Sequence, residues 1–319
     1  MQPQSAPKVS IIIPVYNSSP FIDITIKHIL NQTFQAFEVI LVDDGSTDGS
    51  GEICEKYALI DPRFKVVHRQ NAGVSKARNA GIEEASADYI CFCDSDDYYH
   101  PQFLEILYKA IVANPEDIVF CKRDYVDKVY PTEPVSNYNI SYLSRKEVIS
   151  TIFDRFQFAS ANTKIYRRDY LTKEKLKFTA AEDVEFVLRY LRNNERALVI
   201  DVTLYYYLQR EGSILHSDKM PERVSWECDS WLYIYDEYFK NVDDDDKSAF
   251  LRHIYRIILS RFIPYKSSLD VKSKINKLVD NTIMDYRSNK YIPLYERMCC
   301  LAMIKMPFLR VLLSSIRKN

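Results

Sequence analysis

Glycine is scarce in this sequence, and its scarcity argues against two classes of enzyme. The 319 residues include only 6 glycines, and all but one of these lie before residue 82, so tight turns are expected mainly in the N-terminal part. The turn after the first apolar run, PVYNSS at 14–19, contains none. A dinucleotide-dependent oxidoreductase needs a glycine-rich turn at this point. A nucleotidyltransferase that makes nucleotide sugars would show a glycine-rich, basic loop near the start, which is also missing.

The sequence also has almost no net charge and no long apolar run. The 43 basic and 44 acidic side chains nearly cancel, so no basic field indicates a nucleic-acid partner. The first ten residues contain no apolar signal region, and no run approaches the ~20 apolar residues that span a bilayer. The seven cysteines form no Cys-x-x-Cys pair. We therefore expect a reduced, cytoplasmic protein that does not cross a membrane.

Short apolar runs alternate with helical patterns through the first 120 residues. The runs are rich in β-branched residues and predict strands at 9–15, 37–42, 64–68 and 89–93. Apolar residues at helical spacing, or capping turns, follow each run. This alternation predicts an α/β fold with an open, mostly parallel sheet flanked by helices. From 122 to 145 the pattern weakens, which indicates irregular structure or a small antiparallel addition.

The chain is expected to divide near residue 220. Residues 1–220 would form the α/β domain, and residues 221–319 read as helices with stripes of Tyr and Phe. The segment 298–319 carries several basic residues, no acidic residue and a broad apolar helical face. Such a helix can lie on an anionic membrane surface, or it can pack on protein, either on this chain or on a dimer partner. The oligomeric state cannot be read from the sequence.

Two acidic clusters follow predicted strands. Parallel strands bring their carboxyl ends to one edge of a sheet, where ligands bind. The sequence Asp94-Ser95-Asp96-Asp97 directs hard oxygen ligands at a small region, which suits Mg²⁺ or Mn²⁺. Asp43-Asp44-Gly45-Ser46 could accept hydrogen bonds from a base or a ribose. Either cluster can also be an ordinary acidic turn that caps the next helix.

Three further groups have a functional and a structural interpretation. Arg78 lies in a helix near the same edge and could bind phosphate, or it could simply be solvated. Glu182 and Asp183 begin a helix, where a carboxylate can act as general base or merely complement the helix dipole. Arg210 and His216, in QREGSILHS, suit a diphosphate contact and a metal ligand, although a lone histidine is more often structural or exposed.

Taken together, these residues resemble the family 2 glycosyltransferases with the GT-A fold. The resemblance covers about residues 8–217. It is carried by VSIIIPVYN (9–17), QTFQAFEVILVDDGSTDGS (32–50), NAGVSKARNAGI (71–82), YICFCDSDDYYHP (89–101), AAEDVEF (180–186) and, more weakly, YYYLQREGSILHS (205–217).

The resemblance implies a role for each matching residue. The nucleoside would be cradled by Pro14, Tyr16, Asn17 and Asp44, although many members carry Glu where this chain has Asn17. The family's Asp-x-Asp motif maps onto Asp94, near the ribose, and Asp96, on the metal.

The same match implies the residues of the reaction itself. Asp183 would be the catalytic base, and Glu182 would support it or contact the acceptor. Arg210 would face the diphosphate, and His216 matches a metal-binding histidine only loosely.

The family implies a metal-dependent transfer of sugar, with inversion, from a nucleotide sugar, most commonly a UDP-sugar. The acceptor would be a glycan or lipid-linked glycan of a surface-polysaccharide pathway, and the enzyme would be cytoplasmic or peripheral on the membrane's cytoplasmic face. The alternative is an inactive nucleotide-sugar-binding module. The presence of both Asp96 and Asp183 argues against that alternative.

Overall fold

A computed structural model describes most of the chain and divides it into two compact units. The first unit comprises residues 1–145 and 158–213, and the second comprises 146–157 and 214–319. The sequence had placed 146–157 in the N-terminal domain, whereas the structure groups this segment with the C-terminal helices. The described residues are 6–115, 118–130, 132–155, 158–179, 182–192, 194–209, 220–259 and 269–305.

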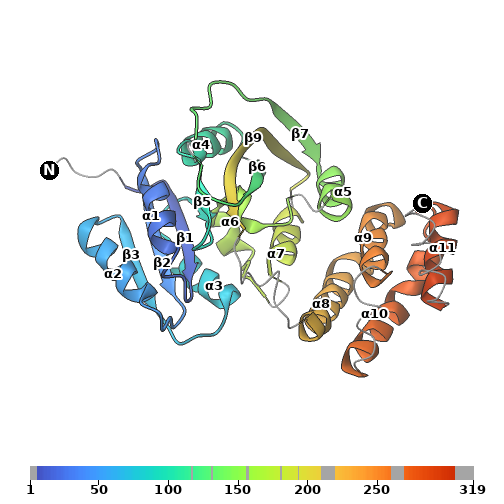
Figure 1. Ribbon diagram of the computed structural model, residues 1–319. Helices are drawn as coiled ribbons and strands as arrows, with labels where there is room; N and C mark the ends of the chain where they lie inside the picture. The colour runs from blue at the N-terminus through green and yellow to red at the C-terminus, as the bar shows by residue number, and fades with distance from the viewer. Residues whose placement is uncertain are drawn as a thin grey trace. The chain divides into compact units, whose positions relative to one another are not determined.

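The four predicted strands form one half of the sheet in the first unit. They are β1 (Val9–Val15), β2 (Phe37–Asp43), β3 (Phe64–His68) and β4 (Tyr89–Phe92), and they pair in parallel in the order β3-β2-β1-β4. The crossover helices are α1 (Ile22–Leu30), α2 (Ser50–Ile60) and α3 (Val74–Glu84). Every residue of β1 and β2 is buried, as expected of strands covered on both faces. Figure 1 shows this arrangement, which confirms the predicted α/β class.

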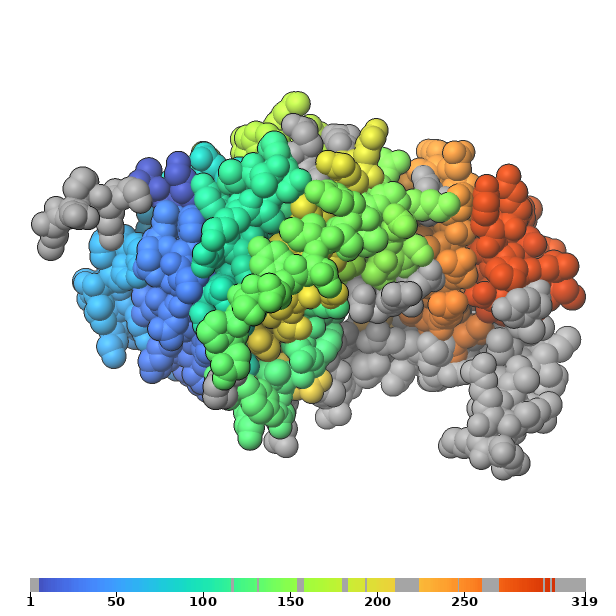
Figure 2. Space-filling view, turned by 90° about the horizontal axis from the view of Figure 1, so that it is seen from above, coloured from blue at the N-terminus to red at the C-terminus, as the bar shows by residue number. Residues whose placement is uncertain are grey.

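The other half of the sheet mixes parallel and antiparallel pairs and was only partly predicted. It contains β5 (Tyr98–Tyr99), β6 (Ile118–Val126), β7 (Ile140–Ser144), β8 (Lys164–Arg167) and β9 (Arg196–Leu208). Among the described residues the sheet has nine strands, in the order β3-β2-β1-β4-β8-β6-β9-β5, with β7 also paired to β9. Figure 2 shows the green and yellow surfaces of these strands side by side, although β6 and β9 are far apart in the sequence. Strands β5 and β8 are too short to give a pattern.

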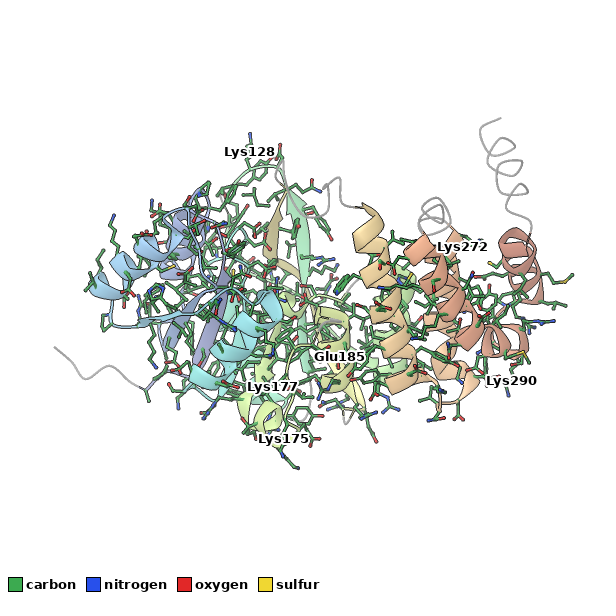
Figure 3. The ribbon with its side chains drawn as sticks, turned by 90° about the horizontal axis from the view of Figure 1, so that it is seen from below. Lys128, Lys175, Lys177, Glu185, Lys272 and Lys290 are labelled. Carbon is green, nitrogen blue, oxygen red and sulfur yellow. The ribbon has the colours of Figure 1, made fainter. Side chains whose placement is uncertain are left out.

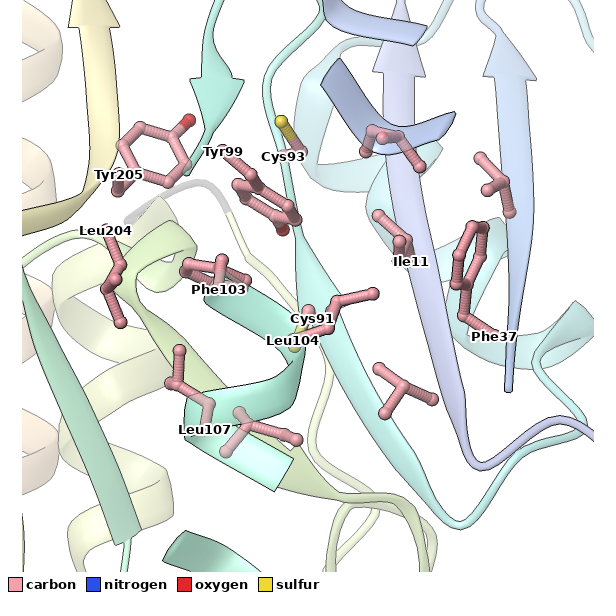
Figure 4. Packing of buried hydrophobic residues seen from close by; sticks show 14 of the residues in the cluster. Ile11, Phe37, Cys91, Cys93, Tyr99, Phe103, Leu104, Leu107, Leu204 and Tyr205 are labelled. Atoms are coloured by element: carbon pink, nitrogen blue, oxygen red, sulfur yellow. The ribbon is translucent and has the colours of Figure 1, made fainter. Parts of the chain in front are cut away.

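A large core cluster of this unit lies between the sheet and the helices α1 and α4 (Phe103–Ala113). Figure 4 shows Phe103 stacked on Tyr99, and the two ring centroids are 3.8 Å apart. Cys91, in β4, and Cys93, directly after the end of β4, belong to the same core. Burial raises the pKa of both thiols well above the usual range. These cysteines are therefore small core side chains without thiolate character.

The second unit is helical, as predicted. Its helices are α5 (Arg145–Arg155), α8 (Met220–Ile234), the π-helix η3 (Tyr235–Phe239), α9 (Asp244–Ile257), α10 (Leu269–Ser288) and α11 (Leu294–Lys305). Phe153 of α5 packs edge-on against Trp231, Phe239 and Phe250, which explains why α5 belongs with the later helices. No helix among the described residues has the length and apolarity needed to traverse a bilayer.

Candidate functional site

The predicted polar clusters meet at one edge of the sheet. Strand β1 pairs in parallel with both β2 and β4, and Asn17, Asp44 and Asp94 follow the carboxyl ends of these three strands. The topology therefore brings together, as the sequence predicted, side chains that lie nearly 80 residues apart in the chain.

Asp44 holds a neighbouring turn in place. Its carboxylate is buried and accepts hydrogen bonds from the backbone N–H groups of Gly73 at 2.7 Å and Ala72 at 3.1 Å. The Nε of Arg69 lies 3.2 Å from the other oxygen. The nucleoside contact expected of Asp44 stays a prediction, and in the structure this carboxylate holds the backbone that leads into α3.

The segment after β1 presents a more open surface. Asn17 has a φ of 47°, and its side-chain oxygen accepts a hydrogen bond from the N–H of Thr47 at 2.9 Å. Asparagine tolerates this left-handed conformation better than most residues. Pro14 is buried within β1, whereas Tyr16 is 52% exposed. Of the four residues assigned to the nucleoside, Tyr16 and Asn17 are therefore the accessible ones.

Arg78 lies inside the unit and bridges two acidic residues. It is only 4% exposed, which excludes the solvated alternative. Its Nη1 donates to Oδ1 of Asp183 and its Nη2 donates to Oδ1 of Asp94, each at 2.8 Å. Helix α3 can approach the sheet because it carries Gly81, where a Cβ would lie 2.3 Å from a methyl carbon of Ile12.

A short turn forms a second bridge between the same two carboxylates. In the 3₁₀ turn η1 (Ala161–Thr163), the N–H of Ala161 donates to Oδ2 of Asp183 at 3.1 Å. The side-chain amide of Asn162 donates to Oδ2 of Asp94 at 2.7 Å. Asp94 and Asp183 are thus joined by a cationic bridge through Arg78 and a neutral bridge through η1. The sequence gave no signal for η1, because Ser-Ala-Asn-Thr is typical of any polar turn.

Asp97 is the buried member of the acidic motif. Its carboxylate accepts a hydrogen bond from the hydroxyl of Tyr205 at 2.5 Å and from the N–H of Leu208 at 3.1 Å. Burial, together with the negative charges of Asp94 and Asp96, raises the pKa of Asp97 well above its usual range. Three carboxyl groups are crowded into residues 94–97, and burial together with this crowding disfavours a charge on Asp97.

The carboxyl groups of the acidic motif at 94–97 fit a divalent cation that the substrate's phosphates would also help to hold. Among the described residues, no three His, Cys, Asp or Glu side chains form a ready-made metal cage. Asp94 and Asp97 accept internal hydrogen bonds, and Asp96, in the same motif, is half-buried. Mg²⁺ typically takes one or two protein carboxylates and completes its shell with phosphate and water. Arg210 and His216 lie outside the described residues.

Asp183 is the second residue of α7 (Glu182–Leu191). Glu185, labelled in Figure 3, fixes this helix, because its buried carboxylate accepts a hydrogen bond from the hydroxyl of Thr179 at 2.9 Å. The side chain of Asp183 remains 24% exposed and can meet a substrate. Glu182 begins the helix, and its side chain lies outside the described part of the chain.

Lys164 is a buried cation beneath this arrangement. Its ammonium donates to the backbone carbonyl of Ser160, at the start of the η1 turn, and lies 4.7 Å from the centroid of the Phe120 ring. Burial lowers the pKa of Lys164 to about 7, although the negative charge of Asp183 acts in the opposite direction. The sequence did not single out this lysine, because Ser-Ala-Asn-Thr-Lys-Ile-Tyr-Arg-Arg at 160–168 has no pattern that predicts burial of its charged residues.

Comparison with known proteins finds clear relatives. Residues 10–174 match the family described as Glycosyl transferase family 2. The chain is 32% identical over 291 residues to the uncharacterized glycosyltransferase EpsJ of Bacillus subtilis, which covers 86% of this chain and 83% of EpsJ.

Two solved structures share the fold. S. aureus TarS 1–349 in complex with UDP-GlcNAc has a TM-score of 0.66 and 24% identity, covering 88% of this chain and 81% of that chain. The mannosyltransferase PcManGT from Pyrobaculum calidifontis, in complex with GDP-Man and Mn²⁺, has a TM-score of 0.53 and 13% identity, covering 95% of this chain and 88% of that chain.

Proposed function

The chain belongs to glycosyl transferase family 2, and from this premise we propose that it transfers a sugar from a nucleotide sugar to an acceptor hydroxyl, with inversion at the anomeric carbon. The observation that carries the proposal is the double bridge between Asp94 and Asp183. It couples the acidic motif at the end of β4 to an accessible carboxylate at the start of α7. A donor-binding group and a base are thereby held in one rigid arrangement.

The donor would bind at the carboxyl edge of β1, β2 and β4. Tyr16 and Asn17 would contact the nucleoside there, and Pro14 and Asp44 would shape the pocket by fixing the strand end and the turn before α3. The likeness to TarS with UDP-GlcNAc and to PcManGT with GDP-Man supports a nucleotide-sugar donor. We take a UDP-sugar as the first candidate.

The acidic motif would hold Mn²⁺ or Mg²⁺ through Asp96, with His216 as a further candidate ligand. The three carboxyl groups within residues 94–97 support this assignment, as does the Mn²⁺ bound by PcManGT. Such an ion, when bound, would offset the negative charge that develops on the departing diphosphate. Arg210 is the candidate side chain of this protein for the same charge.

Asp183 would remove the proton from the attacking hydroxyl. In a single displacement, the acceptor oxygen forms its bond to the anomeric carbon as the bond to the nucleoside diphosphate breaks, so one base on the acceptor side is sufficient. A carboxylate offers about four lone-pair directions, and Arg78 and Ala161 use one on each oxygen of Asp183. Capacity for the acceptor proton therefore remains.

Arg78 acts in this scheme as a positioning residue. It would orient the base and Asp94 together. The phosphate contact expected from the sequence stays a prediction. Glu182 would lie on the acceptor side of the helix start, since neighbouring helical residues point about 100° apart. The acceptor would be a glycan or lipid-linked glycan, and the basic tail at 298–319 would bring the enzyme to the cytoplasmic face of a membrane.

The alternative is a module that binds nucleotide sugars without turnover. Incubation with a panel of UDP-sugars and Mn²⁺, followed by measurement of free UDP, separates the two functions. The proposal expects UDP release with at least one donor, and release that the Asp183→Asn variant loses. Tight donor binding with no release across the panel, with or without a mixture of glycan acceptors, would favour the binding module.

A further inference from the structure

Two tyrosines at the end of β6 and β9 form a paired aromatic surface. The strands run parallel, and their register sets Tyr125 beside Tyr207. The ring centroids are 5.3 Å apart, with an interplanar angle of 56°. Tyr125 is 49% exposed and Tyr207 is half-buried. Such a pair leaves apolar ring surface in contact with water, and aromatic side chains commonly line ligand sites.

Strand alternation places this pair on the face of the sheet that carries the acidic motif. Tyr205 and Tyr207 share a face, and the hydroxyl of Tyr205 reaches Asp97 at 2.5 Å. The antiparallel pairing of Tyr98 with Tyr206 sets Asp97 beside Tyr207. Tyr98 and Tyr206 stack on each other at 4.9 Å, and by alternation they occupy the opposite face.

The order of the strands places the pair on the acceptor side of the site. The sheet runs β2-β1-β4-β8-β6-β9. The nucleoside is proposed at β1 and β2, and Asp183 is tied to the end of β4 and to the turn before β8. Strands are spaced by about 4.8 Å, so β6 and β9 lie roughly 10–15 Å from β4. The pair therefore lies beyond the base, on the side away from the nucleoside.

The chemistry of the pair fits a sugar ring. A pyranose presents an apolar patch of C–H bonds that packs against aromatic rings, and its hydroxyls need polar partners at the rim. The guanidinium of Arg123 lies 5.1 Å from the centroid of the Tyr125 ring and supplies such donors. A lipid chain would instead need a longer apolar groove.

We infer that Tyr125 and Tyr207 form a stacking surface for a pyranose ring of the acceptor, with Arg123 at its polar rim. The acceptor is accordingly a saccharide whose sugar ring lies next to the attacking hydroxyl. The inference rests on the proposed function, because it takes the nucleotide to lie between β2 and β4.

The test measures binding directly. Methyl pyranosides of glucose, galactose and N-acetylglucosamine are titrated by saturation-transfer NMR in the presence of UDP and Mg²⁺, and calorimetry measures UDP affinity separately. Tyr125→Ala and Tyr207→Ala should each weaken pyranoside binding about tenfold, with UDP affinity unchanged. Tyr207→Phe should keep most of the binding, because stacking needs the ring and not the hydroxyl, and it also covers the case of an alanine variant that fails to fold.

Tyr142→Ala is the matched control. Tyr142 resembles Tyr125 in its surroundings: it is 52% exposed on β7, which also pairs with β9, and the guanidinium of Arg196 lies 4.9 Å from the centroid of its ring. Tyr142 differs in position, because it lies beside Leu198, ten residues before the end of β9. The control should bind pyranosides like wild type. Unchanged binding in both Tyr125→Ala and Tyr207→Ala, or wild-type protein that binds UDP but no pyranoside, would overturn the inference alone. Failure of wild type to bind any nucleotide would instead contradict the proposed function.

Discussion

Arg78 donates a 2.8 Å hydrogen bond to Asp183, across 105 residues of sequence. The same guanidinium reaches Asp94 at 2.8 Å, so one side chain sets the relative position of the acidic motif and the candidate base. The planar guanidinium has two terminal nitrogens on one rigid fork, which is what such a bridge requires.

Arg78→Lys should therefore keep the charge and lose the bridge. An ammonium is a single point donor and cannot hold two carboxylates in a fixed geometry. Small misplacements of a reacting group cost up to ~10²-fold in rate, so we expect kcat to fall substantially with little change in UDP affinity. Arg63→Lys is the control, because Arg63 pairs with Asp61 in the loop before β3 and its replacement should leave the rate unchanged.

Lys164 predicts a specific pH dependence of stability. Burial lowers the pKa of Lys164 to about 7 in the folded protein. The charged or titratable groups that act on it there are Asp183, Arg123 and Cys121. In the unfolded chain this lysine keeps its proton up to about pH 10. Between these values the unfolded state binds more protons, so this lysine makes the free energy of unfolding rise with pH.

Lys164→Met should remove that rise. Urea unfolding at a series of pH values from about 7 to about 10 measures it, and wild type should gain stability relative to the variant as the pH increases. Lys109→Met, on an exposed helix surface, is the control and should show no such trend. A wild-type-minus-variant difference that stays flat or falls over this range would contradict a neutralised buried lysine.

The metal assignment predicts separate effects for two residues. Asp96→Asn keeps the size of the side chain and removes its charge, so metal-stimulated UDP release should be abolished while the melting temperature changes little. His216→Ala should weaken the apparent affinity for Mn²⁺. Normal turnover of Asp96→Asn in Mn²⁺ would refute the assignment of Asp96, and an unchanged metal titration would return His216 to a structural role.

The basic tail predicts membrane association. Co-sedimentation with anionic liposomes should retain the full chain and lose a variant that lacks residues 305–319, with neutral liposomes as the control. Most of this segment lies outside the described residues. Full-length protein that never sediments with anionic liposomes would favour a helix packed on protein instead.

The first half of the sheet was predictable because β1 and β2 are buried on both faces, and three of the four residues of β4 are buried as well. A continuous apolar run such as VSIIIPV, followed by a polar turn, is typical of a strand in the interior of a parallel sheet. The positions of Asp44, Asp94 and Asp183 in one region followed from the same topology and from the family resemblance.

The contacts within the site were not predictable, because they depend on long-range packing. The sequence indicated a phosphate contact for Arg78 and gave no sign of its ion pairs with Asp94 and Asp183, which depend on how closely α3 packs on β1 at Gly81. The turn at 161–163 and the buried Lys164 belong to a half of the sheet that is mixed and includes very short strands. Sequence periodicity cannot identify such residues, because each is an isolated position whose contact partners are distant in the sequence.

The central claim is that Asp183 is the base of a sugar transfer, and the Asp183→Asn variant tests it most directly. The measurement compares UDP affinity and the rate of sugar transfer for wild type, Asp183→Asn and Glu182→Gln. We predict that Asp183→Asn binds UDP like wild type but transfers sugar at least ~10²-fold more slowly, and that Glu182→Gln is affected less. Transfer by Asp183→Asn at near the wild-type rate, or loss of transfer only in Glu182→Gln, would contradict the account.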